Sequence, residues 1–363
     1  MQKKIPQLDG VRGIAILVVI MHNESGRFSS LHLERIFRSG WMGVDLFFVL
    51  SGLLITRILI NTKTTPNYFR NFYVRRCLRI WPLYYALLFF MFVVVPFARP
   101  SEASLVFGRS SPWWAYPLFL QNFLVPNSAG ATGPLGVTWS LAVEEQFYLF
   151  WPLVVRYCNV SKLRRISLAV VCASPVLRLC LSLGHVNIYS NPFCRLDGLM
   201  AGAFIAATLD RSHDVPARSR LAVGGVLIAL PLALWTDRLG ALWVAISFIT
   251  LAAASFVYLA LFSRKRWFRI ALSNRFLVHT GTVSYGLYLL HKIPFDAAQG
   301  IHVSGFSLLT FTVCASGGYA AAVLSWELLE KPLLRLKRHF PSGSVSEVRS
   351  LSFETVYLPA RRA

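Results

Sequence analysis

The chain has few charged residues and, among these, few acidic ones. Only 15% of its 363 residues are charged, and 16 Asp and Glu stand against 37 Lys and Arg. By contrast, 55% are hydrophobic and 14% aromatic, and the mean hydropathy is +0.53. A water-soluble domain does not need that much apolar surface. The composition therefore excludes an ordinary soluble globular protein and indicates an integral membrane protein.

Cysteine is scarce and scattered. The six cysteines stand singly, without a CxxC pair. Such spacing fits neither a disulfide framework nor a zinc-type site, so we expect apolar packing and predict no metal site. The first apolar run also lacks a clear small-residue cleavage site, so we expect a retained helix rather than a signal peptide.

Long apolar runs recur along the chain, and short basic or Pro- and Gly-containing segments connect them. A helix needs about 20 residues to cross a hydrocarbon core of about 30 Å. The pattern predicts an all-α integral membrane protein with ten transmembrane helices in one domain, residues 1–338, followed by a disordered cytoplasmic tail, residues 339–363. The predicted spans are 8–23, 41–60, 78–98, 139–157, 166–183, 193–209, 220–236, 241–262, 279–296 and 306–330.

One further apolar segment, residues 112–124, is too short to cross a membrane and is broken by Pro117. We expect it to be interfacial or re-entrant, with Trp113, Trp114 and Tyr116 at the level of the lipid headgroups.

The net charge of +21 indicates how the chain is oriented in the membrane and does not indicate a nucleic-acid partner. Clusters of Lys and Arg at 63–79, 162–165, 264–275 and 331–338 fall on one side of the predicted helices, and sparser arginines fall on the other. Basic residues mark the cytoplasmic side of membrane proteins. The asymmetry predicts a multi-pass protein of the cell inner membrane with both termini in the cytoplasm. Part of the basic charge is available for an anionic cytosolic ligand.

Two adjacent acids, Glu144 and Glu145, lie within the predicted span 139–157. A carboxylate near the centre of a spanning helix costs about 2.5–3.5 kcal/mol on insertion scales, so it usually faces a polar cavity. The first predicted helix carries Arg12 and His22, which are separated by about 15 Å along a helix axis. They are either an interfacial anchor and a helix-end histidine, or an anion-binding group and a general base.

Other polar residues interrupt apolar runs. Arg75, Arg76 and Arg79 occupy one turn and are either topology signals or a phosphate grip. Polar residues that we expect in the interior of the bundle are Asp45, Arg195, Asp197 and His291.

Seven segments, in this order, resemble the acyltransferase-3 family, whose best-known members O-acetylate bacterial surface polysaccharides. The resemblance covers residues 7–338, and any one segment is a weak signal whereas seven in order are highly specific. The segments are LDGVRGIAILVV, GVDLFFVLSGLLIT, YVRRCLRIWPLYY, TWSLAVEEQFYLFWP, RLDGLMAG, SYGLYLLH and WELLEKP.

The resemblance implies a ten-helix bundle that transfers an acyl group, usually acetyl, from cytosolic acyl-CoA to a hydroxyl of a carbohydrate or glycolipid acceptor. Acyl-CoA is then a donor substrate, and we predict no permanently bound cofactor. By position in the matching segments, Arg12 and His22 correspond to the essential pair of the first helix. The cluster Arg75, Arg76 and Arg79 corresponds to the basic motif near the donor.

One departure from the family pattern concerns the first helix. The family usually has a step of eleven residues from the Arg to the His, whereas here the step is ten and Asn23 holds the usual position. Eleven residues return nearly to the same helix face, while ten fall about 80° short. We predict His22 as the general base or acyl-accepting group, with Glu144 or Glu145 orienting its ring.

A transporter or flippase of an anionic or lipid-linked solute is the alternative, because a bundle of helices with buried charges serves that function too. Against it, no inverted repeat and no paired Gly- or Pro-broken helices are evident. No hydrolase-like segment follows the last predicted helix, so we expect the membrane domain or a partner to complete the reaction.

Overall fold

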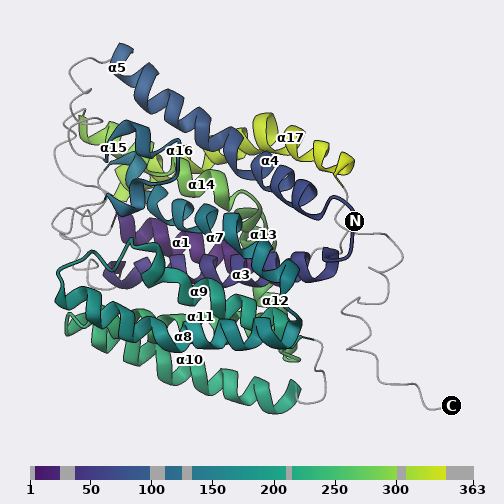
Figure 1. Ribbon diagram of the computed structural model, residues 1–363. Coiled ribbons are helices and arrows are strands. Elements are labelled where there is room, and N and C mark those ends of the chain that lie inside the picture. Colours follow the sequence, from purple (N-terminus) through teal and green to yellow (C-terminus); the bar gives the residue numbers. More distant parts are fainter. Residues whose placement is uncertain are drawn as a thin grey trace.

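The computed structural model describes residues 5–24, 37–98, 111–124, 133–209, 215–300 and 308–340. Every regular element in these ranges is a helix (Figure 1). The predicted tail from residue 341 onward and several cations used for the orientation, including Arg27, Arg35, Arg99 and Arg109, lie outside the described residues.

The α-helices are α1 (Pro6–Asn23), α3 (Gly43–Thr62), α4 (Tyr68–Phe89), α5 (Val95–Ala98), α7 (Thr138–Tyr157), α8 (Val160–Leu183), α9 (Pro192–Thr208), α10 (Val215–Arg238), α11 (Leu242–Phe262), α12 (Arg266–Leu272), α13 (Arg275–Thr282), α14 (Ser284–Leu290), α15 (Lys292–Gly300), α16 (Leu308–Ser325) and α17 (Lys331–Arg335).

Two π-helical turns join neighbouring α-helices into longer ones. The turn η3 (Phe90–Val94) links α4 to α5, and η9 (Trp326–Glu330) links α16 to α17. Short 3₁₀ turns complete the set: η2 (Arg38–Met42), η5 (Trp113–Ala115), η6 (Gln121–Phe123), η7 (Pro134–Val137) and η10 (Leu336–His339).

Six helices in the described ranges are long and apolar enough to cross a membrane: Arg38–Thr62, Tyr68–Ala98, Val160–Leu183, Ala217–Arg238, Leu242–Phe262 and Leu309–His339. They match six of the ten predicted spans. Helices α1, α7 and α9 form where spans were predicted, but α1 and α7 carry the charged residues and α9 has only 17 residues. The ten-span count is therefore not confirmed by length and composition.

The predicted span 279–296 is not one helix. It is divided among α13, α14 and α15, with breaks at Val283 and His291. Ser284 donates a side-chain hydrogen bond to the carbonyl of Gly281, which helps to satisfy the helix end at the first break. Hydropathy taken over a whole span does not register such a local break.

Segment 112–124 folds as short 3₁₀ turns, and Trp113 and Trp114 are exposed as expected. Tyr116 is not at the surface. It is 4% exposed, its ring packs on Phe92, and its carbonyl accepts a hydrogen bond from Tyr84. The prediction of a headgroup position for Tyr116 was wrong, because this segment folds back onto α4.

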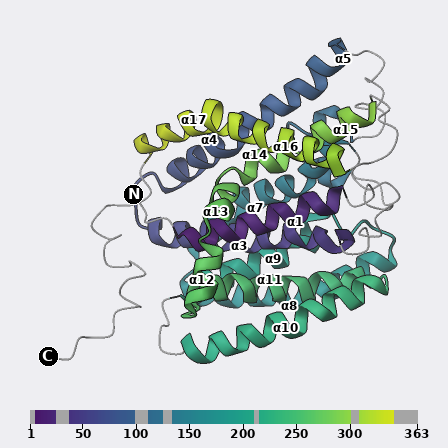
Figure 2. The same cartoon turned by 180° about the vertical axis from the view of Figure 1, so that it is seen from behind.

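The central layer of the bundle contains α1, α3, α7 and α9, as both views show (Figures 1 and 2). Helices α8, α10 and α11 cover one side of it, and α4, α14, α16 and α17 cover the other. The charged helices α1 and α7 thus lie inside, and apolar side chains of α4 and α10, such as Phe89 and Leu227, face outward. This arrangement puts the predicted site residues in the interior.

Candidate active site

Four arginines converge near one end of the bundle. Helix α4 presents Arg75, Arg76 and Arg79 within little more than one turn, and Arg12 of α1 interacts electrostatically with Arg79. Arg76 interacts in the same way with Arg75 and Arg79. Lys337, beyond α17, adds a fifth cation to the cluster. Like charges at this density repel one another unless an anion neutralises them, so the cluster is suited to an anionic ligand.

The arginines differ in how many of their donors are in use. Arg12 pairs with Asp9 at 3.0 Å, and Arg75 donates to the carbonyls of Lys337 and Phe340 at 3.3 and 2.9 Å. The Arg76 guanidinium lies 5.8 Å from two aromatic ring centres, and its buried Nε has no hydrogen-bond partner. Arg76 therefore keeps donor capacity for a ligand.

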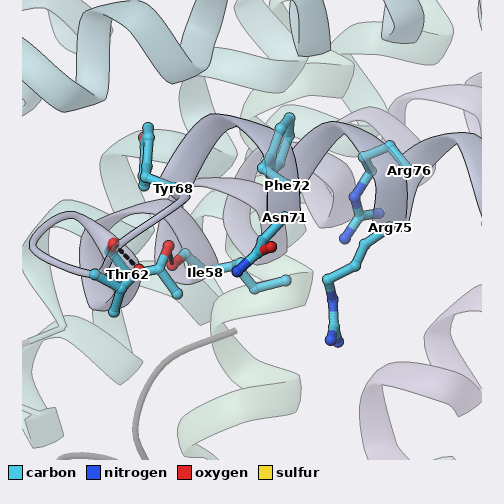
Figure 3. Close-up of a pocket in the computed structure, with 8 residues that line it drawn as sticks. Ile58, Thr62, Tyr68, Asn71, Phe72, Arg75 and Arg76 are labelled. Atoms are coloured by element: carbon cyan, nitrogen blue, oxygen red, sulfur yellow. Dashed lines mark hydrogen bonds between the residues drawn. The ribbon is translucent and has the colours of Figure 1, made fainter. Parts of the chain in front are cut away.

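A pocket opens between the end of α3 and the first half of α4, next to this cluster (Figure 3). Arg75 and Arg76 project toward it from α4. The lining mixes hydroxyl, amide, aromatic and guanidinium groups: Ile58, Thr62, Thr65, Tyr68, Asn71, Phe72, Arg75 and Arg76. Such a lining offers hydrogen-bond donors beside the arginine cluster.

The two adjacent glutamates face different neighbours. Glu144 accepts hydrogen bonds from Ser51 of α3 at 2.7 Å and from Tyr148 at 2.9 Å. Glu145 accepts one from Trp81 of α4 at 3.2 Å, and its second oxygen is buried without a partner. Consecutive helical residues point about 100° apart, so one glutamate turns to α3 and the other to α4.

Glu144 belongs to the arginine cluster. Arg12 and Arg76 are the cations that act on it electrostatically, and Arg76 also acts on Glu145. The structure therefore joins Arg12, Arg76, Glu144 and Glu145, which are predicted site residues from three helices.

His22 lies at the other end of α1, and the structure does not join it to the glutamates. Its ring faces the backbone of Phe37 and Arg38 and the charges of Asp237 and Lys292. Its Nδ1 is buried and has no hydrogen-bond partner. The predicted contact of Glu144 or Glu145 with His22 is absent among the described residues, because the two groups lie at different depths of the bundle.

Asn23 occupies the position that the helix geometry assigns to the face of Arg12. Its Nδ2 lies 3.0 Å from Nε2 of His291, which is 1% exposed. The Nδ1 of His291 lies 2.9 Å from the carbonyl oxygen of Tyr288, so Nδ1 donates and Nε2 accepts from the Asn23 amide. Asn23, and not His22, therefore contacts His291, and His22 faces another direction.

Asp45, Arg195 and Asp197 form part of a buried network between α3, α8 and α9. Arg195 donates to Asp45 at 2.9 Å, and Asp197 accepts from Arg178 of α8 at 2.8 Å. The two neighbours on α9 therefore pair with different helices and not with each other. Arg178 was not predicted from the sequence, although an arginine within an otherwise apolar run indicates a side chain that faces the interior of the bundle.

Aromatic rings enclose the Arg195 guanidinium. Its Cζ lies 5.5–5.8 Å from four ring centres: Trp41, Phe48, Trp139 and Tyr189. A cation over aromatic faces is stabilised by their quadrupoles, more so when it is desolvated. The network thus packs the N-terminal ends of α3, α7 and α9 around the Arg195 guanidinium.

In the described ranges, no three His, Cys, Asp or Glu side chains gather closely enough to hold a metal ion.

The chain matches the family model described as an acyltransferase domain over residues 5–326. It is 30% identical over 372 residues to peptidoglycan O-acetyltransferase OatA of Listeria monocytogenes, covering 92% of this chain and 56% of that protein. It is 38% identical over 194 residues to a Bacillus subtilis protein, YrhL, provisionally named a peptidoglycan O-acetyltransferase, covering 48% of this chain and 28% of that one.

A Staphylococcus aureus protein with the provisional name of O-acetyltransferase is 24% identical over 390 residues, covering 98% of this chain and 60% of that protein. The chain thus spans less than two thirds of the length of each of these relatives. No solved structure matches it.

Proposed function

Because the chain belongs to this acyltransferase family and is therefore an O-acyltransferase, we propose that it moves an acetyl group from acyl-CoA to a hydroxyl of a glycan or glycolipid. It does so as a multi-pass protein of the cell inner membrane, with ten membrane passes and both termini in the cytoplasm. The donor binds at the cytoplasmic end, where the basic residues gather.

The arginine cluster is the observation that carries the choice of donor. Coenzyme A presents several phosphate groups, and arginine forks are suited to bind phosphate oxygens in pairs. Arg12, Arg76 and Arg79 surround one region, and Arg76 has an unpartnered buried donor. Arg75 and the adjoining pocket extend the site toward the bundle end.

Glu144 and Glu145 keep this basic site stable when it is empty. They place two carboxylates beside Arg12 and Arg76, and Ser51 and Trp81 hold those carboxylates in place. A bound phosphate takes over part of this neutralisation. The glutamates thus act on donor binding, and their role toward His22 is indirect.

His22 is the general base of the proposed reaction. Its axial separation from Arg12 is about 15 Å, which is comparable to the reach of a pantetheine arm. The bare Nδ1 accepts the proton of the acceptor hydroxyl while the hydroxyl oxygen attacks the thioester carbonyl carbon. The C–S bond breaks, and the departing thiolate takes up the proton from the imidazolium. The products are the O-acyl ester and free CoA thiol.

The test is acceptor-dependent CoA release by purified protein in lipid vesicles, given acetyl-CoA and a panel of glycans. We expect Arg79→Gln to raise the KM for acetyl-CoA about tenfold or more, since a charged phosphate contact contributes about 1.5–3 kcal/mol. Arg165→Gln, which removes an exposed arginine of α8 outside the cluster, is the matched control and should leave KM unchanged.

The same assay tests the base. His22→Ala should lose turnover by about 100-fold or more, the typical contribution of a general base. Asn23→Ala removes the neighbouring polar side chain and should retain far more activity. If the His22→Ala variant turned over as fast as the wild type, another group would accept the proton.

A further inference from the structure

The end of α1 carries a second polar cluster, which is separate from the arginines. The turn η2 passes beside His22, because a Cβ placed on Gly40 would lie only 2.8 Å from the Cβ of His22. The backbone of Phe37 and Arg38 faces the imidazole. Residues 37–40 therefore form one wall of the His22 site.

Ser39 in this wall reaches to α10. Its Oγ donates to Oδ2 of Asp237 at 3.2 Å, close to the end of that helix. Trp41 and Met42 of η2 pack with Ala229 and Ala233 of α10, so the turn and the helix are fixed to each other. Ser39 thereby fixes the Asp237 carboxylate one residue along the chain from Gly40, which lies against His22.

Two charged side chains face His22, one of each sign. They are Asp237 on α10 and Lys292 on α15, and both interact electrostatically with the imidazole. Arg38 of η2 contributes its backbone, and Glu24, two residues along the chain from His22, is only 2% exposed. When the ring takes up a proton, Asp237 is the anion placed to compensate for it.

We propose that Asp237, held by Ser39, is the positioning carboxylate that stabilises the protonated His22 during acyl transfer. This proposal rests on the function proposed above for His22. It assigns to Asp237 the role that the sequence suggested for Glu144 or Glu145. Asp237 neither touches the acceptor nor exchanges a proton, and it acts only through the charge on the imidazole.

The test uses Asp237→Asn, which keeps the shape and removes the charge, Asp237→Glu, which restores the charge, and Arg238→Gln as the control. Arg238 is the exposed neighbour of Asp237. The full chain in lipid vesicles is assayed for kcat, KM and the pH–rate profile. In parallel, the His22 ring is titrated by NMR in ¹⁵N-histidine-labelled protein, with His22→Gln to assign the signal.

We expect Asp237→Asn to lower kcat about tenfold with little change in KM for acetyl-CoA. In this variant, the acid limb of the pH–rate profile and the titration midpoint of His22 should both move to lower pH by about half a unit or more, as expected when one negative charge is lost. Asp237→Glu should recover most of both. Arg238→Gln should change neither kcat nor the His22 titration midpoint. If only the overall charge mattered, Arg238→Gln would shift the midpoint in the opposite direction to Asp237→Asn.

The outcomes separate the two proposals. An unchanged titration of His22 in Asp237→Asn overturns the role of Asp237, whether or not the protein transfers acyl groups under the assay conditions. If His22→Ala leaves turnover at the wild-type level, the choice of His22 as the base is overturned instead. A kcat loss in Asp237→Asn without any shift in pH dependence shows a merely structural role and also rejects the proposal.

Discussion

At the residue scale, the pair of Asp45 and Arg195 is a salt bridge removed from water. Both side chains are essentially inaccessible, and Arg195 has two further nitrogens, Nε and Nη1, without hydrogen-bond partners. The Arg195 charge is therefore neutralised by one carboxylate and stabilised by the surrounding aromatic rings. Removing one member of such a pair leaves an uncompensated buried charge, which costs about 3–5 kcal/mol.

We therefore expect Asp45→Asn to lower the free energy of unfolding by about 3–5 kcal/mol, measured by thermal or denaturant unfolding in detergent. The double variant Asp45→Leu with Arg195→Met removes both charges and should recover at least half of that loss. Equal instability of the single and double variants would show that packing, and not the unpaired charge, is responsible.

The sequence identified several charged residues of the interior but not their partners. Glu144 and Glu145 were expected to face a polar interior because a carboxylate is unfavourable in lipid, and they do lie beside Arg12 and Arg76. The pairing of Arg195 with Asp45, and not with Asp197, depends on how α3 crosses α9. Asp237 was overlooked because it stands near a helix end, where an acidic residue is not unusual.

At the scale of elements, close crossings between helices depend on glycine. A Cβ on Gly52 of α3 would lie 1.8 Å from the carbonyl oxygen of Leu199, and a Cβ on Gly202 of α9 would lie 2.0 Å from that of Val49. The two helices thus approach through backbone atoms on both sides, as small residues permit in membrane bundles. This crossing also sets the distance between Asp45 and Arg195.

We expect Gly52→Ala to separate α3 from α9 and to lower the free energy of unfolding by about 2–3 kcal/mol, in the range of overpacking in a well-packed core. Gly224→Ala on α10 is the control, because nothing lies within 4 Å of a Cβ there. That control should be neutral or slightly stabilising, since Ala favours helix over Gly. Similar stabilities of the two variants in the same unfolding assay would contradict the close crossing.

Element types were easier to predict than their continuity. Apolar runs predicted the long helices α3, α8, α10 and α11 to within six residues at each end, because the need to satisfy backbone groups in lipid leaves helix as the available form. The division of 279–296 was missed, since it depends on local bonds such as that of Ser284 to Gly281 and on tertiary packing. The inward fold of Tyr116 was missed for the same reason.

At the scale of the whole molecule, the two ends of the bundle differ in chemistry. The arginine cluster and its pocket occupy one end, and His22, Asp237, Asn23 and His291 occupy the other. The central charges of α1 and α7 lie between them. The family was predicted from seven short segments and is confirmed by the match over residues 5–326. The spacing of Arg12 and His22 could not tell which direction His22 faces, because that depends on the packing of η2 and α10.

The proposed direction of transfer requires that the arginine end face the cytoplasm. Helix α8 tests this, since it spans 24 residues and has exposed residues at both ends: Ser161 on the side of the basic clusters, and Val186, 42% exposed, beyond the other end. In a background with the native cysteines replaced, Val186→Cys should react with a membrane-impermeant maleimide on intact cells. Ser161→Cys should react only after permeabilisation, because basic residues such as Lys162 favour the cytoplasmic side. The reverse labelling pattern would place the arginines outside, away from cytosolic acyl-CoA, and would remove the physical basis for that donor.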